Sequence, residues 1–123
     1  MGELFDPVHA LEAYHDALNA HDIERIGTFL AESARYTSRG LGDAIGREAI
    51  LAALTRYFDL HPDYRAWDED ITGAGPNAAR AHWRLTATNR LTGVAIARSG
   101  VETVTFDADG RIALIEAIDD LNT

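Results

Sequence analysis

Residues Pro7–Ser38 read PVHALEAYHDALNAHDIERIGTFLAESARYTS, and this stretch decides the order of the first elements. Its opening part has apolar residues at helical spacing, namely Val8, Leu11, Tyr14 and Leu18. The tripeptide Asn19-Ala20-His21 interrupts that pattern. We therefore predict a first helix that turns Tyr14 toward the core.

A second helix is predicted directly after this break. Asp22 stands at the N-cap position, and Glu24 in the first turn suits the positive end of the helix dipole. The apolar stripe that follows comprises Ile23, Ile26, Phe29 and Leu30. The β-prone segment Arg35–Ser38 then predicts a short strand. Two helices joined by a minimal elbow place an aromatic hydroxyl inside the fold, at the beginning of a pocket.

The remainder predicts one more helix and four strands. The helix is expected from about Gly46 to Leu60, where His61-Pro62-Asp63 ends it, because the residue before a proline resists helical geometry. The strands are expected at Tyr64–Thr72, Ala78–Thr88, Val94–Phe106 and Arg111–Leu121, with a bulge at Gly100. Short connections favour an antiparallel meander. The predicted class is α+β, with three N-terminal helices packed on a strongly curved, mostly antiparallel sheet that forms a cone with an apolar interior.

Composition limits the possible functions. With 123 residues, 46% of them hydrophobic, residues 1–123 are expected to form a single domain. The absence of cysteine and lysine excludes thiolate nucleophiles, Cys-based zinc sites and Schiff-base chemistry. A net charge of −9 argues against nucleic acid or an anionic membrane as a partner. No apolar run is long enough to span a bilayer, and no secretory signal precedes Pro7, so a cytoplasmic location is expected.

Three sequence features resemble the nuclear transport factor 2-like superfamily, and within it the SnoaL-like polyketide cyclases and the ketosteroid isomerases. These features are Tyr14-x-x-x-Leu18-Asn19-Ala20-x-Asp22, the helix start Gly46-Arg47-Glu48-Ala49-Ile50, and the hairpin Asp109-Gly110-Arg111-Ile112. The resemblance extends from about Val8 to Asp120. It implies a cone-shaped fold that hosts isomerases, dehydratases, cyclases, hydrolases and plain binding modules.

Tyr14 and Glu102 are the first two candidate catalytic residues. A phenol in an apolar cavity can donate a hydrogen bond to a developing oxyanion, although a core tyrosine bonded to a backbone carbonyl would look the same in sequence. Alternation places Glu102 on the face of Val104 and Phe106, where apolar neighbours would raise its pKa. If a bulge at Gly100 shifts the register, Glu102 faces solvent or a subunit interface instead. The resemblance implies that Tyr14 and Glu102 occupy the two oxyanion-hole positions of the isomerases.

His82 and Asp119 complete the candidate catalytic set. With the turn centred near Thr92, His82 is expected opposite Glu102, where a carboxylate would orient its imidazole for acid–base work. His82 shares its face with arginines, so that face could equally be solvated or form a dimer seam. If it lines the cavity, Arg84 becomes a clamp for a carboxylate or enolate. The resemblance places Asp119 near the acid–base aspartate of the cyclases, whereas the alternative is a solvated pair with Asp120 at the chain end.

One departure from the resembled pattern concerns the general base. The isomerases carry their base on the short first strand, and the matching residue here is Ser38, which cannot take a carbon-bound proton unaided. If the protein is an enzyme, its base would then have to be His82, Asp119 or Glu102. The predicted substrate-binding residues are Phe29, Tyr36, Ser38, Tyr57, Trp67, Arg84 and Val104.

No metal site or cofactor is predicted. The other histidines form no same-face pair at metal-ligand spacing and are interpreted as surface residues: His9, His15, His21 and His61. The predicted function is cofactor-independent acid–base chemistry on a small, partly apolar carbonyl or hydroxylated molecule by a homodimer that pairs through the outer sheet face. The alternative is a non-catalytic ligand-binding or dimerisation module of the same fold.

Overall fold

The computed structural model describes residues 5–120. Its elements, in chain order, are α1 (Pro7–Asn19), α2 (Ile23–Phe29), β1 (Leu30–Ser38), β2 (Gly42–Ile45), α3 (Arg47–Leu60), β3 (Arg65–Gly73), β4 (Ala78–Thr88), β5 (Ala95–Phe106) and β6 (Ile112–Asp119). The α+β class is confirmed, with three helices and a six-stranded mixed sheet.

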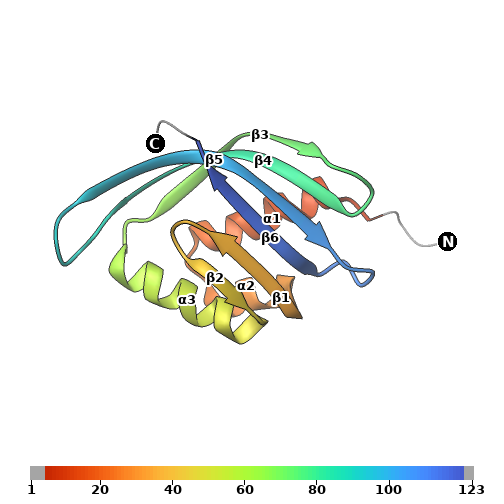
Figure 1. Ribbon diagram of the computed structural model, residues 1–123, viewed down its shortest axis with the longest axis horizontal. Helices are drawn as coiled ribbons and strands as arrows, with labels where there is room; N and C mark the ends of the chain where they lie inside the picture. Colours follow the sequence, from red (N-terminus) through yellow and green to blue (C-terminus); the bar gives the residue numbers. More distant parts are fainter. Residues whose placement is uncertain (1–4, 121–123) are drawn as a thin grey trace.

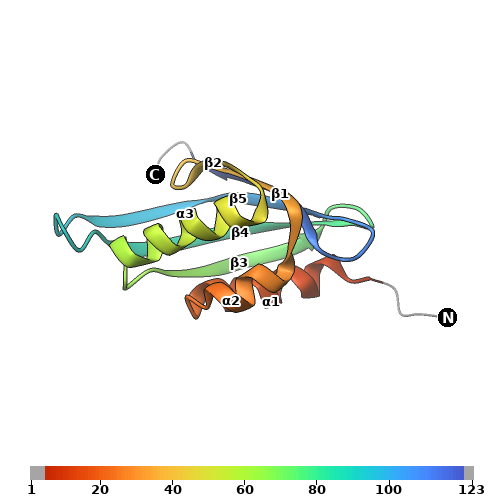
Figure 2. The same cartoon turned by 90° about the horizontal axis from the view of Figure 1, so that it is seen from below.

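The six strands form one sheet in the order β2-β1-β6-β5-β4-β3. Strands β3 to β6 make the predicted antiparallel meander, and β1 joins it by pairing in parallel with β6. Figure 1 shows β4 and β5 as long arched strands with the helices gathered beneath the arch, and Figure 2 shows the same layers from below. The core lies between the helices and the inner face of the sheet.

The first half of the chain differs from prediction in two details. The second helix stops at Phe29 because Leu30 is extended, so β1 begins five residues before the predicted Arg35. The sequence analysis also missed β2, which folds back on β1 after a turn that requires a positive φ of 82° at Gly42. The predicted cap is present, since the Asp22 side chain accepts a hydrogen bond from the backbone N–H of Arg25.

The predicted alternation along β4 and β5 is confirmed. The inner face of β4 buries Ala79, Ala81 and Trp83, whereas Arg80, His82 and Arg84 are exposed. On β5 the buried residues include Glu102, Val104 and Phe106. Glu102 therefore faces the interior, as its position in the alternation indicated.

The register between β4 and β5 corrects the expected position of His82. His82 pairs with Val101, and Glu102 pairs with Ala81. The prediction was one residue out, and a shift of one residue moves a side chain to the opposite face of the sheet. His82 therefore cannot share the face of Glu102.

Gly100 does not form the predicted bulge, since the pairing of β4 with β5 continues through it opposite Trp83. The irregularity of β5 lies instead between Thr105 and Phe106, against β6. A Cβ atom at Gly100 would lie 2.6 Å from Cζ2 of Trp83 and would overlap the carbonyl oxygen of Ile118. Gly100 is thus required for close packing of the indole on the strand.

No helix among residues 5–120 is long and apolar enough to cross a membrane.

Replacing Gly100 by alanine should destabilise the fold by about 1–3 kcal/mol, because the new methyl group must displace the Trp83 ring and the backbone of β6. The free energy of unfolding from urea denaturation measures this loss. The matched control is Gly73→Ala, since a Cβ atom at Gly73 meets nothing within 4 Å. Equal stability of the two variants would contradict the packing role of Gly100.

Candidate functional site

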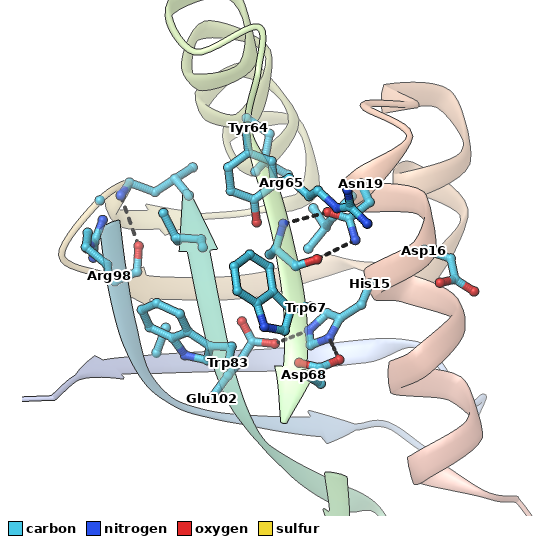
Figure 3. A pocket seen from close by; sticks show the side chains of 18 of the residues that line it. His15, Asp16, Asn19, Tyr64, Arg65, Trp67, Asp68, Trp83, Arg98 and Glu102 are labelled. Atoms are coloured by element: carbon cyan, nitrogen blue, oxygen red, sulfur yellow. Dashed lines mark hydrogen bonds and ion pairs between the residues drawn. The ribbon is translucent and has the colours of Figure 1, made fainter. Parts of the chain in front are cut away.

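A cavity of about 590 Å³ lies between the helices and the inner face of the sheet. Its residues come from α1, β1, α3, β3, β4, β5 and β6, from the loop after β1 and from the loop between α3 and β3. The walls contain six aromatic residues, namely Tyr36, Tyr57, Phe58, Tyr64, Trp67 and Trp83. Charged residues of both signs lie among them, including His15, Arg65, Asp68, Arg98 and Glu102. Such a volume and lining are typical of a site for a small molecule with both apolar and polar parts. Figure 3 shows several of these side chains around the cavity.

A cluster of three charged side chains lies in the cavity wall (Figure 3). His15 of α1 contacts Asp68 of β3 through Nδ1 at 2.6 Å and Glu102 of β5 through Nε2 at 2.7 Å. The side chains of His15 and Asp68 are 16% exposed, and that of Glu102 is 7% exposed. We refer to these three residues as the His15 cluster.

The His15 cluster carries an imidazolium ion. Burial lowers the pKa of His15, but the charge of Glu102 and the hydrogen bonds to Asp68 and Glu102 outweigh burial and raise that pKa to about 10. Both ring nitrogens are therefore protonated near neutral pH, and each donates to a carboxylate. One positive and two negative charges leave the cluster with a net charge of −1.

Asn19 fixes the position of His15 relative to β3. One turn after His15, the Asn19 side chain donates from Nδ2 to the carbonyl oxygen of Ala66 at 2.6 Å and accepts from the backbone N–H of Ala66 at 2.8 Å. The amide thus satisfies two backbone groups on the edge strand of the sheet. This contact holds α1 against β3, so that His15 reaches Asp68 two residues further along.

Phenol groups stand close to the His15 cluster. Tyr36 and Tyr64 line the cavity, and burial together with the charge of Glu102 raises the pKa of both. Both hydroxyls therefore stay protonated and can donate hydrogen bonds. Tyr14 is fully buried and does not line the cavity; its ring packs edge-on against Phe29, and its hydroxyl has no hydrogen-bond partner among the described residues.

A second charged pair lies where β5 meets β6. Arg98, a cavity residue, donates from Nε and Nη2 to the two oxygens of Asp119 at 2.6 and 2.7 Å. The Asp119 side chain is only 8% exposed, and Arg39 approaches it at 3.6 Å. Asp119 is thus held beneath Arg98 and is not a solvated residue at a frayed chain end. Arg98 also lies 5.9 Å from the ring centroid of Trp83.

The structure separates the candidate residues into three groups. Those that line the cavity are Glu102, Tyr36, Ser38, Tyr57 and Trp67. Those in the core or behind the cavity wall are Tyr14, Phe29, Val104 and Asp119. Those on the outer face of β4 are His82 and Arg84.

The two outer-face residues are corrections to the expected site. His82 bonds Asp70 at 2.9 Å, and Arg84 bonds Glu69 at 2.9 Å, with all four side chains about half exposed. Their alternation with the buried Ala81 and Trp83 turns them away from the cavity. Arg84 is therefore no clamp for a ligand inside the cavity.

His15 is a candidate site residue that the sequence analysis missed, since it was interpreted as a surface residue. The other three histidines that were interpreted as surface residues differ in their exposure and contacts. His9 is exposed, His21 stacks on Phe58 at 4.3 Å, and the buried His61 donates from Nδ1 to the carbonyl oxygen of Tyr57 at 2.9 Å. Among the described residues, no group of three or more His, Cys, Asp or Glu is arranged to hold a metal ion.

We expect the His15 imidazolium to stabilise the fold in a pH-dependent way. The folded-state pKa of about 10 lies above the ordinary value of 6.5, so this contribution is fully present below about pH 6.5 and is lost as the pH rises through 10. Unfolding free energies measured from pH 6 to 9 should fall in the wild type more steeply than in His15→Gln.

His82→Gln is the matched control, because this exposed histidine also has a raised pKa from its bond to Asp70. It should retain most of the wild-type pH dependence. Nitrogen-15 spectra should show two protonated ring nitrogens on His15 at pH 8. A neutral ring at that pH would contradict the assignment.

The comparisons with known proteins agree with this architecture. A sequence search of curated proteins finds no significant match. Among solved structures, RV0760c from Mycobacterium tuberculosis, in complex with estradiol-17beta-hemisuccinate, has a TM-score of 0.82 at 17% identity, with 94% of this chain and 95% of that chain covered.

Two enzymes have similar folds. The epoxide hydrolase/cyclase-like enzyme SalBIII, which has a role in pyran ring formation in the polyether salinomycin, has a TM-score of 0.80 at 15% identity, covering 93% of this chain and 90% of the other. An LEH-like epoxide hydrolase of M. tuberculosis has a TM-score of 0.79 at 20% identity, covering 94% and 84%. The family model described as a SnoaL-like domain matches residues 11–115. The chain therefore belongs to the SnoaL-like family of the nuclear transport factor 2-like superfamily.

Proposed function

We propose that this protein is a cofactor-independent acid–base enzyme, of cyclase, isomerase or dehydratase type, acting on a small apolar carbonyl or hydroxylated molecule in the cavity. The observation that carries this proposal is Glu102, a largely buried carboxylate in the wall of a 590 Å³ cavity, bonded to the His15 imidazolium. A largely buried carboxylate that lines a cavity beside a specific charged partner is a candidate catalytic group.

In this proposal Glu102 transfers the proton, and His15 holds the Glu102 side chain in place. Oε1 of Glu102 accepts from His15, and the other carboxylate oxygen accepts no hydrogen bond from a described residue. That oxygen can take a proton from a carbon next to a ligand carbonyl, which leaves an enol or enolate, and can return the proton to another atom of the ligand. The imidazolium pairs with Glu102 while it is ionised, which is before the first transfer and after the second.

Tyr36 replaces Tyr14 as the proposed donor to the ligand oxygen. It lines the cavity, and its raised pKa keeps the phenol protonated. A phenol directed at a developing oxyanion contributes on the order of 3 kcal/mol where water is excluded. Tyr14, buried behind this wall, would act only by packing.

Arg98 offers a second contact for the ligand. It lines the cavity, and its two bonds to Asp119 fix the direction of the guanidinium group. We assign to Asp119 a positioning role through Arg98, in place of the acid–base role considered from the sequence. Ser38 and Tyr57, which line the same cavity, are retained as proposed ligand contacts.

The similar structures support a ligand of this kind. One of them is in complex with estradiol-17beta-hemisuccinate, and two are described as epoxide hydrolase or cyclase-like enzymes. We also propose that residues 1–123 act as a single domain and pair as a homodimer through the outer sheet face. On that side of the sheet Ile45 and Ile118 are 67% and 71% exposed.

A non-catalytic ligand-binding module is the second candidate function. Its support is that the cavity carboxylate already has an ion-pair partner and that Ser38 stands where the resembled isomerases carry their base. The Ser38 hydroxyl accepts a hydrogen bond from the backbone N–H of Leu41 at 3.0 Å, which is a structural use of this side chain.

Deuterium exchange separates the two functions without knowledge of the natural substrate. The wild type should catalyse incorporation of deuterium at the α-carbon of small cyclic ketones in heavy water, followed by proton NMR. Glu102→Gln should slow this exchange by about 100-fold or more, because the amide cannot accept the proton.

The matched control for this measurement is Glu116→Gln, on the exposed side of β6, which should exchange at the wild-type rate. Equal rates for Glu102→Gln and the wild type would contradict the catalytic role of Glu102. Binding of the ketones with no exchange in the wild type would favour the binding module.

A further inference from the structure

The His15 cluster leaves two carboxylate oxygens without a hydrogen bond (Figure 3). Oδ2 of Asp68 and Oε1 of Glu102 accept from His15, whereas the other oxygen of each carboxylate accepts from no described residue. Among the described buried side chains, the polar atoms that lack both a partner and accessible surface are the hydroxyl of Tyr14 and Nε1 of Trp83. The two unbonded carboxylate oxygens are not among them, so a small molecule in the cavity can reach them.

The cluster also carries a charge that nothing in the cavity wall offsets. Its imidazolium balances one of the two carboxylates, so a net charge of −1 remains on side chains that are at most 16% exposed. A charge placed so deeply is costly unless an opposite charge accompanies it. Two arginines line the cavity in the described part of the chain: Arg98 is bonded to Asp119, and Arg65 is exposed at the start of β3. A positively charged ligand group would supply the missing charge.

An irregularity of β3 separates Asp68 from the acidic residues that follow it. In a regular strand Asp68 and Asp70 would share one face. The pairing with β4 shifts by one residue between them, which makes Glu69 an extra residue in β3. Such a bulge redirects side chains, and bulges are common beside functional sites. The two following acidic residues form their ion pairs on the outer face of the sheet, whereas Asp68 joins the buried cluster.

A third unpaired polar group stands beside the cluster. Tyr36 of β1 lines the cavity and is only 6% exposed, and its hydroxyl forms no hydrogen bond with a described residue. Burial and then the charge of Glu102 raise the pKa of Tyr36, which places the phenol near that carboxylate. Buried polar groups are normally hydrogen-bonded, so this hydroxyl indicates that a polar part of a ligand binds here. The aromatic rings of the walls add an attraction for a cation through their π electrons.

We propose that the cavity selects ligands that carry a protonated amino group, which donates a hydrogen bond to Oδ1 of Asp68 and offsets the remaining negative charge of the His15 cluster. An ammonium group donates and does not accept, which matches a carboxylate oxygen that only accepts. Glu102 keeps its unbonded oxygen for the proton transfer, and Tyr36 keeps its hydroxyl for the ligand oxygen. The assignment rests on the proposed function only in using the same cavity, since it requires no turnover.

The test compares three probes that share a naphthalene ring and differ in charge. At pH 7, 2-naphthylmethylamine is a cation, 2-naphthylmethanol is neutral and 2-naphthoate is an anion. Their dissociation constants for the wild-type protein are measured by isothermal titration calorimetry. We expect the amine to bind at least about tenfold more tightly than the alcohol, and the naphthoate to bind more weakly than the alcohol.

Two further measurements locate the amine. The Nδ1 signal of His15 in nitrogen-15 spectra, assigned by its loss in His15→Gln, should move more with the amine than with the alcohol, because this nitrogen bonds Asp68. Asp68→Asn should lower the ratio of amine to alcohol affinity by about fivefold or more, since the charged acceptor becomes a neutral amide. The matched control is Glu69→Gln, which removes the adjacent charge, bonded to Arg84 on the outer face, and should keep the wild-type ratio.

The assignment is wrong if the amine does not bind, if either other probe binds as tightly, or if the amine moves the His15 signal no more than the alcohol does. An equal affinity ratio in Asp68→Asn and Glu69→Gln would also contradict it, because attraction would then come from the overall charge of −9. The probe comparison and the spectra use wild-type protein, so they decide even if Asp68→Asn folds poorly. Amine preference without deuterium exchange supports this assignment and contradicts the catalytic proposal, whereas exchange without amine preference does the reverse.

Discussion

The ion pair between His15 and Glu102 joins two parts of the chain that lie 87 residues apart, and the cavity depends on it. It fixes α1 to the inner face of β5, while Asp68 binds the opposite edge of the same imidazole from β3. Charges this deeply placed are tolerated only when paired, so removal of one partner leaves the others uncompensated. The contact that positions the candidate catalytic carboxylate is therefore also one that docks the first helix on the sheet.

Much of the fold follows from local patterns, and the site follows only in part. The alternation along β5 correctly turned Glu102 inward, because a strand with one buried face leaves little freedom in its side-chain pattern. The predicted position of His82 was wrong because it depended on the exact turn between β4 and β5. An error of one residue in that turn moves every side chain of the strand to the opposite face. His15 could not be assigned, since its partners lie 53 and 87 residues away. The sequence does indicate that His15 faces inward, because His15 lies on the same helical face as Leu11 and Leu18.

Two glycines shape the cavity by leaving space for larger side chains. Gly100 makes room for the Trp83 ring, and a Cβ atom at Gly40 would lie 2.7 Å from Nη1 of Arg98. Trp83 and Arg98 in turn lie close together, with the guanidinium carbon 5.9 Å from the ring centroid. Neither glycine has a positive φ, so backbone conformation does not require glycine at these positions. The side chain that packs against each glycine, Trp83 or Arg98, accounts for the missing Cβ atom. A sequence pattern alone gives no indication of such a neighbour.

Several of the charges in the cavity wall are already paired within the protein. Arg98 is neutralised by Asp119, and the His15 imidazolium offsets one of its two carboxylates. An anionic ligand would have to break one of these pairs or add to the remaining negative charge, and both are costly where water is scarce. A neutral ligand incurs neither cost and can pack against the aromatic side chains of the wall.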